Sequence, residues 1–99
     1  MESSLKDAFI KTDKDLYREM ENANIDIKFS GTTACLTYIK GNKIYCSNLG
    51  DSRAVIFSRN GENWAAQPLS EDHKGENPVE AQRIIINGGR IAPYYDEDG

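Results

Sequence analysis

The polar turn Gly50-Asp51-Ser52 separates two runs of strand-forming residues and places one carboxylate between them. Asp72 and His73 follow in a second polar stretch further along the chain. Carboxylate oxygens and an imidazole nitrogen can bind a hard or borderline divalent cation. These residue types predict a metal-binding site, provided that the fold brings Asp51, Asp72 and His73 together.

Each candidate also has a structural explanation. Aspartate, here Asp51, is common in turns because its carboxylate accepts hydrogen bonds from nearby backbone amides. A single histidine such as His73 is more often a surface or hydrogen-bonding residue than a ligand, because ligands occur in clusters. Arg53 can bind a phosphate or pair with a carboxylate across the strands, and strand alternation favours the structural pair. The residue types alone leave these alternatives open.

Two periodicities predict the elements that position these residues. Over residues 4–21, apolar side chains recur mostly at steps of three and four, which predicts an amphipathic helix with Ser4 as its N-cap. Beyond this helix, β-branched and aromatic runs separated by short turns predict strands. The expected strands cover about 33–40, 43–49, 52–59 and 62–69.

The turns between these strands predict a four-stranded antiparallel meander. Gly41-Asn42 and Gly50-Asp51 have glycine first and suit type II′ turns, whereas Asn60-Gly61 suits a type I′ turn. Counting outward from tight turns fixes the register of the strands. The expected pairs are Thr37 with Cys46, Leu49 with Ser52, and Phe57 with Trp64.

A second helix is predicted near the end of the chain. Asn77 is a suitable N-cap, Pro78 suits the first helical position, and Glu80 completes a capping box. Gly88 can adopt the left-handed conformation that ends many helices. The helix is therefore expected to begin beside Asn77 and to end near Gly88.

A meander of this kind brings three polar segments to one end of the sheet, which we call the rim. These segments are the entry to the first strand at Ser30–Thr33, the central turn at Gly50-Asp51, and the exit from the fourth strand at Leu69–Lys74. The rim then holds all three candidate ligands. The hydroxyl groups available there to orient carboxylates belong to Ser30, Thr32, Ser52 and Ser70.

The first strands of the predicted sheet are apolar on both faces, since apolar residues occupy both sets of alternating positions. A sheet of this kind needs a covering layer on each face, and one long helix with a short second helix cannot supply both. We therefore expect residues 1–99 to form a partial domain. An uncovered apolar face of this size predicts self-association or partner binding.

Composition and charge exclude two classes of partner. The 99 residues carry 12 basic and 16 acidic side chains and a net charge of −4, without the basic stripe of a nucleic-acid binder. No apolar run is long enough to span a bilayer, and the first residues lack the pattern of a secretory signal. The chain is expected to be intracellular, in the cytoplasm or nucleus.

The two cysteines are expected to be reduced thiols. Cys35 lies diagonal to Cys46 in the predicted register, and this separation is too large for an unstrained disulfide.

Five motifs, in order, resemble the metal-dependent protein serine/threonine phosphatases of the protein phosphatase 2C family. They are AFIKTD on the first helix, SGTTA at the start of a strand, KIYCSNLGDSRAV across the central turn, LSEDHK after the fourth strand, and NPVEAQRIIINGGRI around the second helix. The resemblance extends from about Ala8 to Gly89. Each motif alone is weakly specific, whereas their order and separations make the match specific.

The resemblance implies an α+β fold in which this chain is part of an α-β-β-α sandwich, two antiparallel sheets flanked by helices. It implies an enzyme that uses Mg²⁺ or Mn²⁺ and a metal-bridged water to hydrolyse phosphoserine and phosphothreonine in phosphorylated proteins. Asp51 matches an aspartate associated with a weaker, additional metal, and residues 70–99 look like the start of the flap beside the active site. The implied supporting residues are Gly50, Ser52, Thr32, Asp72 and His73 at the rim, and Asn77, Glu80 and Arg83 on the substrate side of the flap.

The chain departs from the family pattern in its core metal ligands. The Asp-Gly-His-Gly-Gly stretch that precedes the first helix in the family is missing, and so is a downstream Asp-Asn motif. The arginine that grips phosphate and the histidine credited as general acid are missing too. We therefore expect most of the metal ligands to lie outside this chain and the 99 residues alone to be inactive. The alternative is a non-catalytic, phosphatase-like binding or regulatory module.

Overall fold

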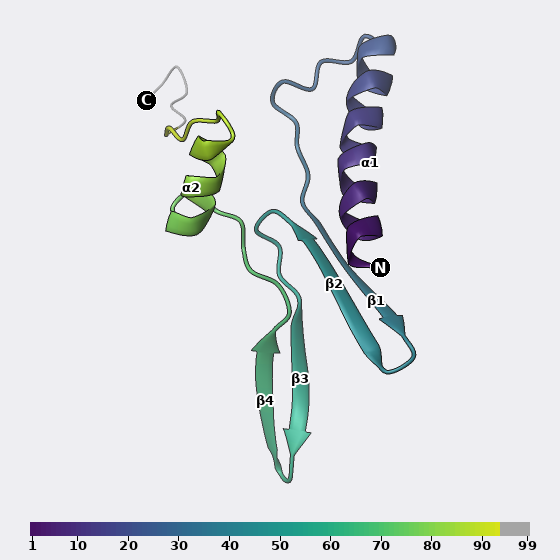
Figure 1. The fold of residues 1–99 in the computed structure, drawn as a ribbon, viewed down its shortest axis with the longest axis vertical. Helices are drawn as coiled ribbons and strands as arrows, with labels where there is room; N and C mark the ends of the chain where they lie inside the picture. The colour runs from purple at the N-terminus through teal and green to yellow at the C-terminus, as the bar shows by residue number, and fades with distance from the viewer. Residues whose placement is uncertain (94–99) are drawn as a thin grey trace.

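The computed structural model describes residues 1–93 and shows two helices and two β-hairpins in an open arrangement (Figure 1). The radius of gyration of the Cα atoms is 17.6 Å, whereas a compact domain of 100 residues has a radius of about 13 Å. The elements are α1 (Glu2–Asn22), β1 (Ala34–Lys40), β2 (Lys43–Leu49), β3 (Val55–Asn60), β4 (Asn63–Pro68) and α2 (Pro78–Ile86).

The strands form two separate two-stranded sheets, so the expected four-stranded meander is wrong. β1 pairs with β2 and β3 pairs with β4, but β2 and β3 do not pair, and the expected pair of Leu49 with Ser52 is absent from the described ladders. The reason lies in the backbone after β2. The carbonyl groups of Gly50 and Ala54 accept hydrogen bonds from residues 73 and 69, so this stretch continues the second hairpin and leaves the first.

The β1–β2 hairpin has the register predicted from its turn. Lys40 pairs with Lys43 around Gly41-Asn42, and Thr37 pairs with Cys46, as expected. Cys35 pairs with Asn48 and is therefore diagonal to Cys46, and both cysteines are free thiols. Tyr38 and Tyr45 form a cross-strand aromatic pair with ring centroids 6.5 Å apart.

The β3–β4 hairpin has a different register from the one expected. Asn60 pairs with Asn63, so the turn residues are Gly61-Glu62 and not Asn60-Gly61. Phe57 therefore faces Ala66, and Trp64 faces Arg59. A type I′ turn at Asn60-Gly61 needs a positive φ at asparagine, whereas the observed turn places its positive φ of 67° on Gly61. Glycine adopts that φ without the steric cost that a side chain brings.

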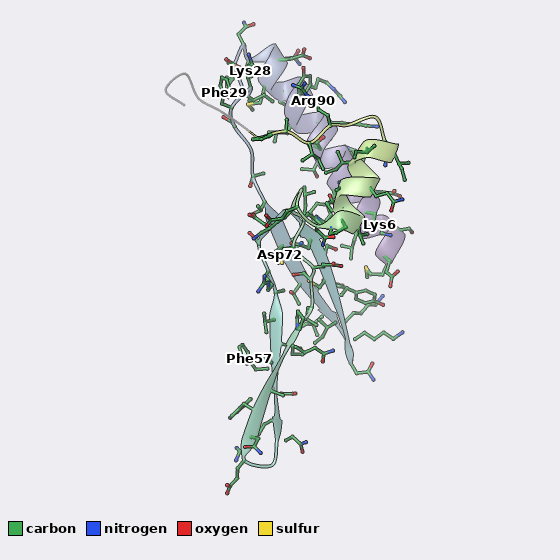
Figure 2. The ribbon with its side chains drawn as sticks, turned by 90° about the vertical axis from the view of Figure 1, so that its left-hand side faces the viewer. Lys6, Lys28, Phe29, Phe57, Asp72 and Arg90 are labelled. Atoms are coloured by element: carbon green, nitrogen blue, oxygen red, sulfur yellow. The ribbon has the colours of Figure 1, made fainter. Side chains whose placement is uncertain are left out.

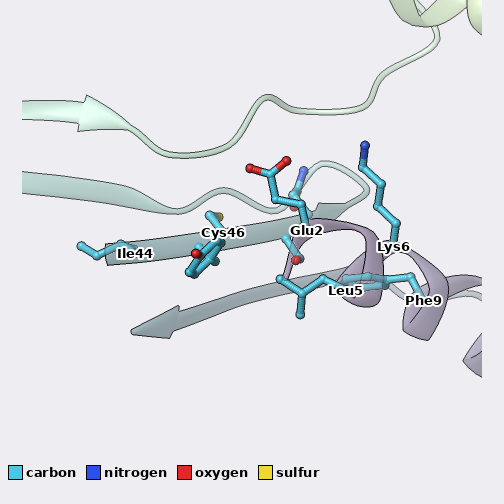
Figure 3. A pocket seen from close by; sticks show the side chains of 9 residues that line it. Glu2, Leu5, Lys6, Phe9, Ile44 and Cys46 are labelled. Carbon is cyan, nitrogen blue, oxygen red and sulfur yellow. The ribbon is translucent and has the colours of Figure 1, made fainter. Parts of the chain in front are cut away.

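α1 lies beside the first hairpin and contacts β2. It begins at Glu2, with Met1 as N-cap and no side-chain cap, so the prediction of Ser4 as N-cap is wrong. Leu5 and Phe9 are half-buried and face a pocket that Ile44 and Cys46 line from the side of β2 (Figure 3). Among the described residues, no helix is both long and apolar enough to cross a membrane.

α2 begins and ends close to the predicted residues. The Asn77 side chain caps it by accepting a hydrogen bond of 3.0 Å from the Val79 amide. Glu80 does not complete a capping box, because its carboxylate pairs with Arg83 one turn later. Gly88 has a φ of 85° and the last carbonyl groups are satisfied in a Schellman motif. Its two bonds run from Gly88 N to Ile85 O at 3.1 Å and from Gly89 N to Ile84 O at 2.8 Å.

Residues 1–93 include no fully buried side chain. Large apolar residues stay accessible on each element, with exposed fractions of 67% for Ile39, 66% for Phe57 and 76% for Val79. α2 packs against no other described element. The two hairpins therefore carry apolar side chains on faces that the described chain leaves uncovered.

Candidate functional site

The structure brings the three predicted polar segments together at the rim, although through a different strand arrangement. The hydroxyl groups of Thr33 and Ser52 are hydrogen-bonded at 2.6 Å, which joins the entry to β1 with the central turn. The amide of His73 donates to the carbonyl of Gly50 at 2.9 Å, which joins the central turn to the exit from β4. Figure 2 shows Asp72 at the junction between the hairpins and α2.

The contact between the central turn and the exit from β4 continues the register of the second hairpin. Val55 pairs with Pro68, and the same counting places Ala54 opposite Leu69 and Gly50 opposite His73. The amide of Leu69 donates to Ala54 O at 2.8 Å, as in an antiparallel pair. The return bonds go to side chains: Ala54 N donates to Ser70 Oγ at 3.0 Å, and Gly50 N donates to His73 Nδ1 at 3.2 Å.

Gly50 occupies a position that only glycine fits. Its φ is 102°, a region that other residues rarely adopt. A Cβ built on Gly50 would lie 2.6 Å from Thr33 Cγ2. The close approach of the turn to the entry of β1 therefore depends on the missing side chain.

Asn48 is a rim residue that the sequence analysis missed. Its Nδ2 donates to Gly50 O at 3.1 Å and to Glu71 O at 3.0 Å, so one amide group bridges both sides of the rim. Its Oδ1 is buried without a hydrogen-bond partner among the described residues. The available signal was an asparagine two residues before a glycine turn, where asparagine side chains often bond to the backbone.

Arg53 and Asp72 form a two-pronged ion pair, which confirms the expected structural role of Arg53. Arg53 Nε donates to Asp72 Oδ1 at 2.9 Å, and a terminal guanidinium nitrogen donates to Oδ2 at 2.7 Å. These hydrogen bonds hold the pKa of Asp72 below its ordinary value, although partial desolvation opposes the shift. The same bonds raise the pKa of Arg53. The Asp72 side chain is 16% exposed and the Arg53 side chain 58%, so the carboxylate is the better covered partner.

Asp51 is exposed, and its carboxylate has no hydrogen-bond or ion-pair partner among residues 1–93. Asp72 is instead bonded to Arg53, and the Nδ1 of His73 is bonded to the Gly50 amide. Over the same residues, no group of three or more histidine, cysteine or acidic side chains could hold a metal ion. The described rim therefore offers Asp51 as a single free carboxylate and not as one member of a ready ligand set.

The hydroxyl groups of the rim bond to the backbone or to each other. Thr32 Oγ1 donates to Thr33 O at 2.9 Å, Ser52 bonds to the Thr33 hydroxyl, and Ser70 accepts from Ala54 N. Within the described part of the chain, none of them, and no Ser30 hydroxyl, orients a carboxylate. The bonds of Ser52 and Ser70 join different rim segments, whereas the bond of Thr32 is local.

The residues expected on the substrate side of the flap have structural partners. Asn77 caps α2 and also donates from Nδ2 to Glu71 Oε1 at 3.3 Å, which links α2 to the rim. Arg83 Nε donates to Glu80 Oε2 at 2.9 Å, and this bond lowers the pKa of Glu80. A role of these residues toward substrate stays a prediction. The end of the predicted flap, residues 94–99, lies outside the described residues.

The chain is similar to known proteins over nearly its whole length. A family model described as Protein phosphatase 2C matches residues 1–97. No solved structure matches the chain.

Two fungal relatives among the curated proteins are similar to most of the chain. Protein phosphatase 2C homolog 2 of Hypocrea jecorina is 42% identical over 87 residues, 88% of this chain and 18% of the relative. Protein phosphatase 2C homolog 3 of Schizosaccharomyces pombe is 39% identical over 89 residues, 90% of this chain and 20% of the relative.

A plant relative extends the match. Probable protein phosphatase 2C 75 of Oryza sativa is 39% identical over 97 residues, which cover 96% of this chain and 22% of the relative. The chain thus spans about a fifth of the length of the curated relatives it matches. The family model covers far more than half of the chain, in agreement with the ordered motifs and the α+β elements. The chain belongs to the protein phosphatase 2C family.

Proposed function

We propose that this chain is one section of a metal-dependent protein phosphatase domain, and that the complete protein hydrolyses phosphoserine and phosphothreonine in other proteins. The proposal is carried by the free carboxylate of Asp51 on a rim held by long-range hydrogen bonds, in a chain that matches the protein phosphatase 2C family over residues 1–97. Since the chain spans about a fifth of its relatives, the activity belongs to the complete protein.

The metal is proposed to be Mg²⁺ or Mn²⁺, and most of its ligands are placed outside these 99 residues. Mg²⁺ requires several oxygen ligands in a near-octahedral arrangement, and Asp51 alone does not provide them. Asp51 is then a ligand to a weaker, additional ion. The supporting residues Gly50, Ser52 and His73 hold the turn through hydrogen bonds and add no carboxylate ligand of their own.

The substrate side is proposed to follow from the rim into α2. Glu71, Asp72 and Asn77 line an open groove beside Arg53, and the bond from Asn77 to Glu71 ties the start of α2 to this groove. Glu80 and Arg83 lie on the first turns of the same helix. A phosphorylated protein that binds at the rim is proposed to contact this groove and the first turns of α2.

The first experiment measures hydrolysis of a phosphothreonine peptide with and without Mn²⁺, for this chain and for the complete reading frame of its gene. We expect Mn²⁺-dependent activity in the complete protein and none in the 99 residues alone. An Asp51→Ala variant of the complete protein is expected to lose turnover while it keeps its unfolding midpoint, because an exposed turn side chain contributes little packing.

The matched control is Asp13→Ala, since Asp13 is an exposed aspartate on α1 without a hydrogen-bond partner among the described residues. It should keep both activity and stability. Equal losses of turnover and stability in Asp51→Ala would count against a role of Asp51 in catalysis. A complete protein that stays inactive with Mn²⁺ would favour the alternative, a phosphatase-like module that acts by binding.

A further inference from the structure

His73 satisfies both backbone groups of Gly50, from a position 23 residues later in the chain. Its amide donates to Gly50 O at 2.9 Å, and its Nδ1 accepts from Gly50 N at 3.2 Å. In a regular antiparallel pair, the second bond would go to the carbonyl of the facing residue. Here the imidazole takes the place of that carbonyl, so the side chain of His73 determines where the Gly50 amide is held.

This substitution makes specific chemical demands on the side chain. A nitrogen that accepts a hydrogen bond must carry a lone pair, so the Nδ1 of His73 is unprotonated in this contact and the ring proton resides on Nε2. The acceptor must also lie at the δ position, two bonds beyond Cβ. Asparagine offers an oxygen at the corresponding position, whereas glutamine offers it one atom further out.

The residues on both sides of Asp51 are fixed while its own carboxylate is free. Gly50 is held by His73 and also by Asn48, and Ser52 is held by Thr33. The Asp51 carboxylate has no hydrogen-bond or ion-pair partner within residues 1–93. The direction of this carboxylate therefore depends on how firmly its two neighbours are held.

The segment that carries His73 is itself anchored at three successive residues. Glu71 O accepts from Asn48, Asp72 accepts twice from Arg53, and His73 binds Gly50. Because this segment is anchored, the Nδ1 of His73 has a defined position even though the residue is exposed. The ion pair with Arg53 also occupies both oxygens of the Asp72 carboxylate, so Asp72 is not a second free carboxylate beside Asp51.

We propose that His73 is a positioning residue for Asp51: its Nδ1 holds the Gly50 amide, and through it the orientation of the Asp51 carboxylate. The inference rests on the proposed function, in that Asp51 contributes to catalysis in the complete protein. His73 does not touch the substrate in this role. It acts only through the backbone of the turn.

The test compares His73→Leu, His73→Asn and His73→Gln in the complete protein. Leucine removes the acceptor, asparagine keeps it at the δ position, and glutamine displaces it. Two quantities are measured: hydrogen exchange of the Gly50 amide by NMR, and kcat and KM on a phosphothreonine peptide. For His73→Leu and His73→Gln we expect Gly50 exchange to be at least about tenfold faster and kcat about tenfold lower, with KM unchanged. His73→Asn should keep both values close to those of the wild type.

Three results would overturn the proposal. Gly50 exchange that is unchanged in His73→Leu and His73→Gln would show that the side chain does not hold the amide. Faster exchange with unchanged kcat would show a merely structural bond. Equal losses in His73→Asn and His73→Leu would show that the δ acceptor is not what matters. If His73→Leu does not fold, the comparison of the asparagine and glutamine variants still decides.

The proposed function fails by a different observation. An Asp51→Ala protein with full activity would reject the catalytic role of Asp51, and with it the positioning role of His73. The hydrogen-exchange measurement needs no activity, so the bond between His73 and Gly50 can be accepted or rejected on its own.

Discussion

Gly50 at the rim and the two glycines at the hairpin tips, Gly41 and Gly61, have positive φ values of 102°, 61° and 67°. A Cβ at Gly50 would lie 2.6 Å from the Thr33 side chain, whereas a Cβ at Gly41 or Gly61 would meet nothing within 4 Å. The same residue type thus serves two purposes. At the tips glycine provides only a turn conformation, and at the rim it also allows two segments to approach closely.

The hydrogen bonds of the two regions differ in the same way. At the tip of the second hairpin, Arg59 Nε donates to Gly61 O at 2.7 Å, a contact between residues two apart. At the rim, Arg53 reaches Asp72 across 19 residues and Asn48 reaches Glu71 across 23. The rim therefore depends on the tertiary fold, whereas the tips are local structures. Figure 2 shows Phe57 on the β3–β4 hairpin, which extends away from the rim.

The largest difference between the regions is expected for alanine in place of these glycines. Gly50→Ala should destabilise the complete protein by about 2–4 kcal/mol, because an unfavourable φ adds to overpacking against Thr33. Gly41→Ala and Gly61→Ala should each cost about 1 kcal/mol from the backbone alone. Chemical denaturation of the three variants measures this. Similar losses in all three would contradict the picture of a packed rim.

A smaller difference is expected between two asparagines. Asn48→Ala removes a bridge to two carbonyl groups and should cost about 1–2 kcal/mol, since Glu71 O loses a partner. Asn63→Ala, at the tip of the second hairpin, should change stability by less than about 0.5 kcal/mol. Unfolding by urea compares the two. A larger loss for Asn63→Ala would show that the tips carry more order than their contacts indicate.

The smallest effect is expected from the Arg53–Asp72 pair, whose arginine is largely exposed. The pKa of Asp72 is lowered in the folded state, so the pair stabilises the protein above the unfolded carboxyl pKa of about 3.9. The contribution is lost as the pH falls through the lowered pKa of the folded state. The wild type should therefore unfold at higher urea than Asp72→Asn at pH 7, and this difference should shrink as the pH falls below about 4. A difference that is independent of pH would assign the effect to packing.

Much of the fold followed from local patterns. The glycine-first pair Gly41-Asn42 predicts the register of the first hairpin, and the capping signals at Asn77 and Gly88 predict the two ends of α2. Alternation and turn chemistry could not predict the separation of the two hairpins. They report which side chains share a face, but they do not show that the Gly50 backbone bonds to His73 instead of continuing from β2.

The sequence predicted which segments form the candidate site, but it did not predict most of the hydrogen bonds between them. The three polar segments meet at the rim, and Arg53 pairs with a carboxylate as expected. The bonds of Asn48 to Glu71 and of His73 to Gly50 could not be predicted, because each depends on the extension of the second hairpin toward the rim. The role of Asp51 toward a metal stays a prediction that the proposed experiments address.

The buried Oδ1 of Asn48 has a consequence for hydration. The Nδ2 of the same side chain is fully used by two carbonyl groups, so the side chain cannot flip to satisfy Oδ1 without breaking both bonds. A buried acceptor left dry costs about 1–3 kcal/mol, and a bound water or a donor from a neighbouring segment removes that penalty. A water or side chain that donates a hydrogen bond to this oxygen holds Asn48 more firmly in place. It therefore also strengthens the link that Asn48 makes between the central turn and the exit from β4.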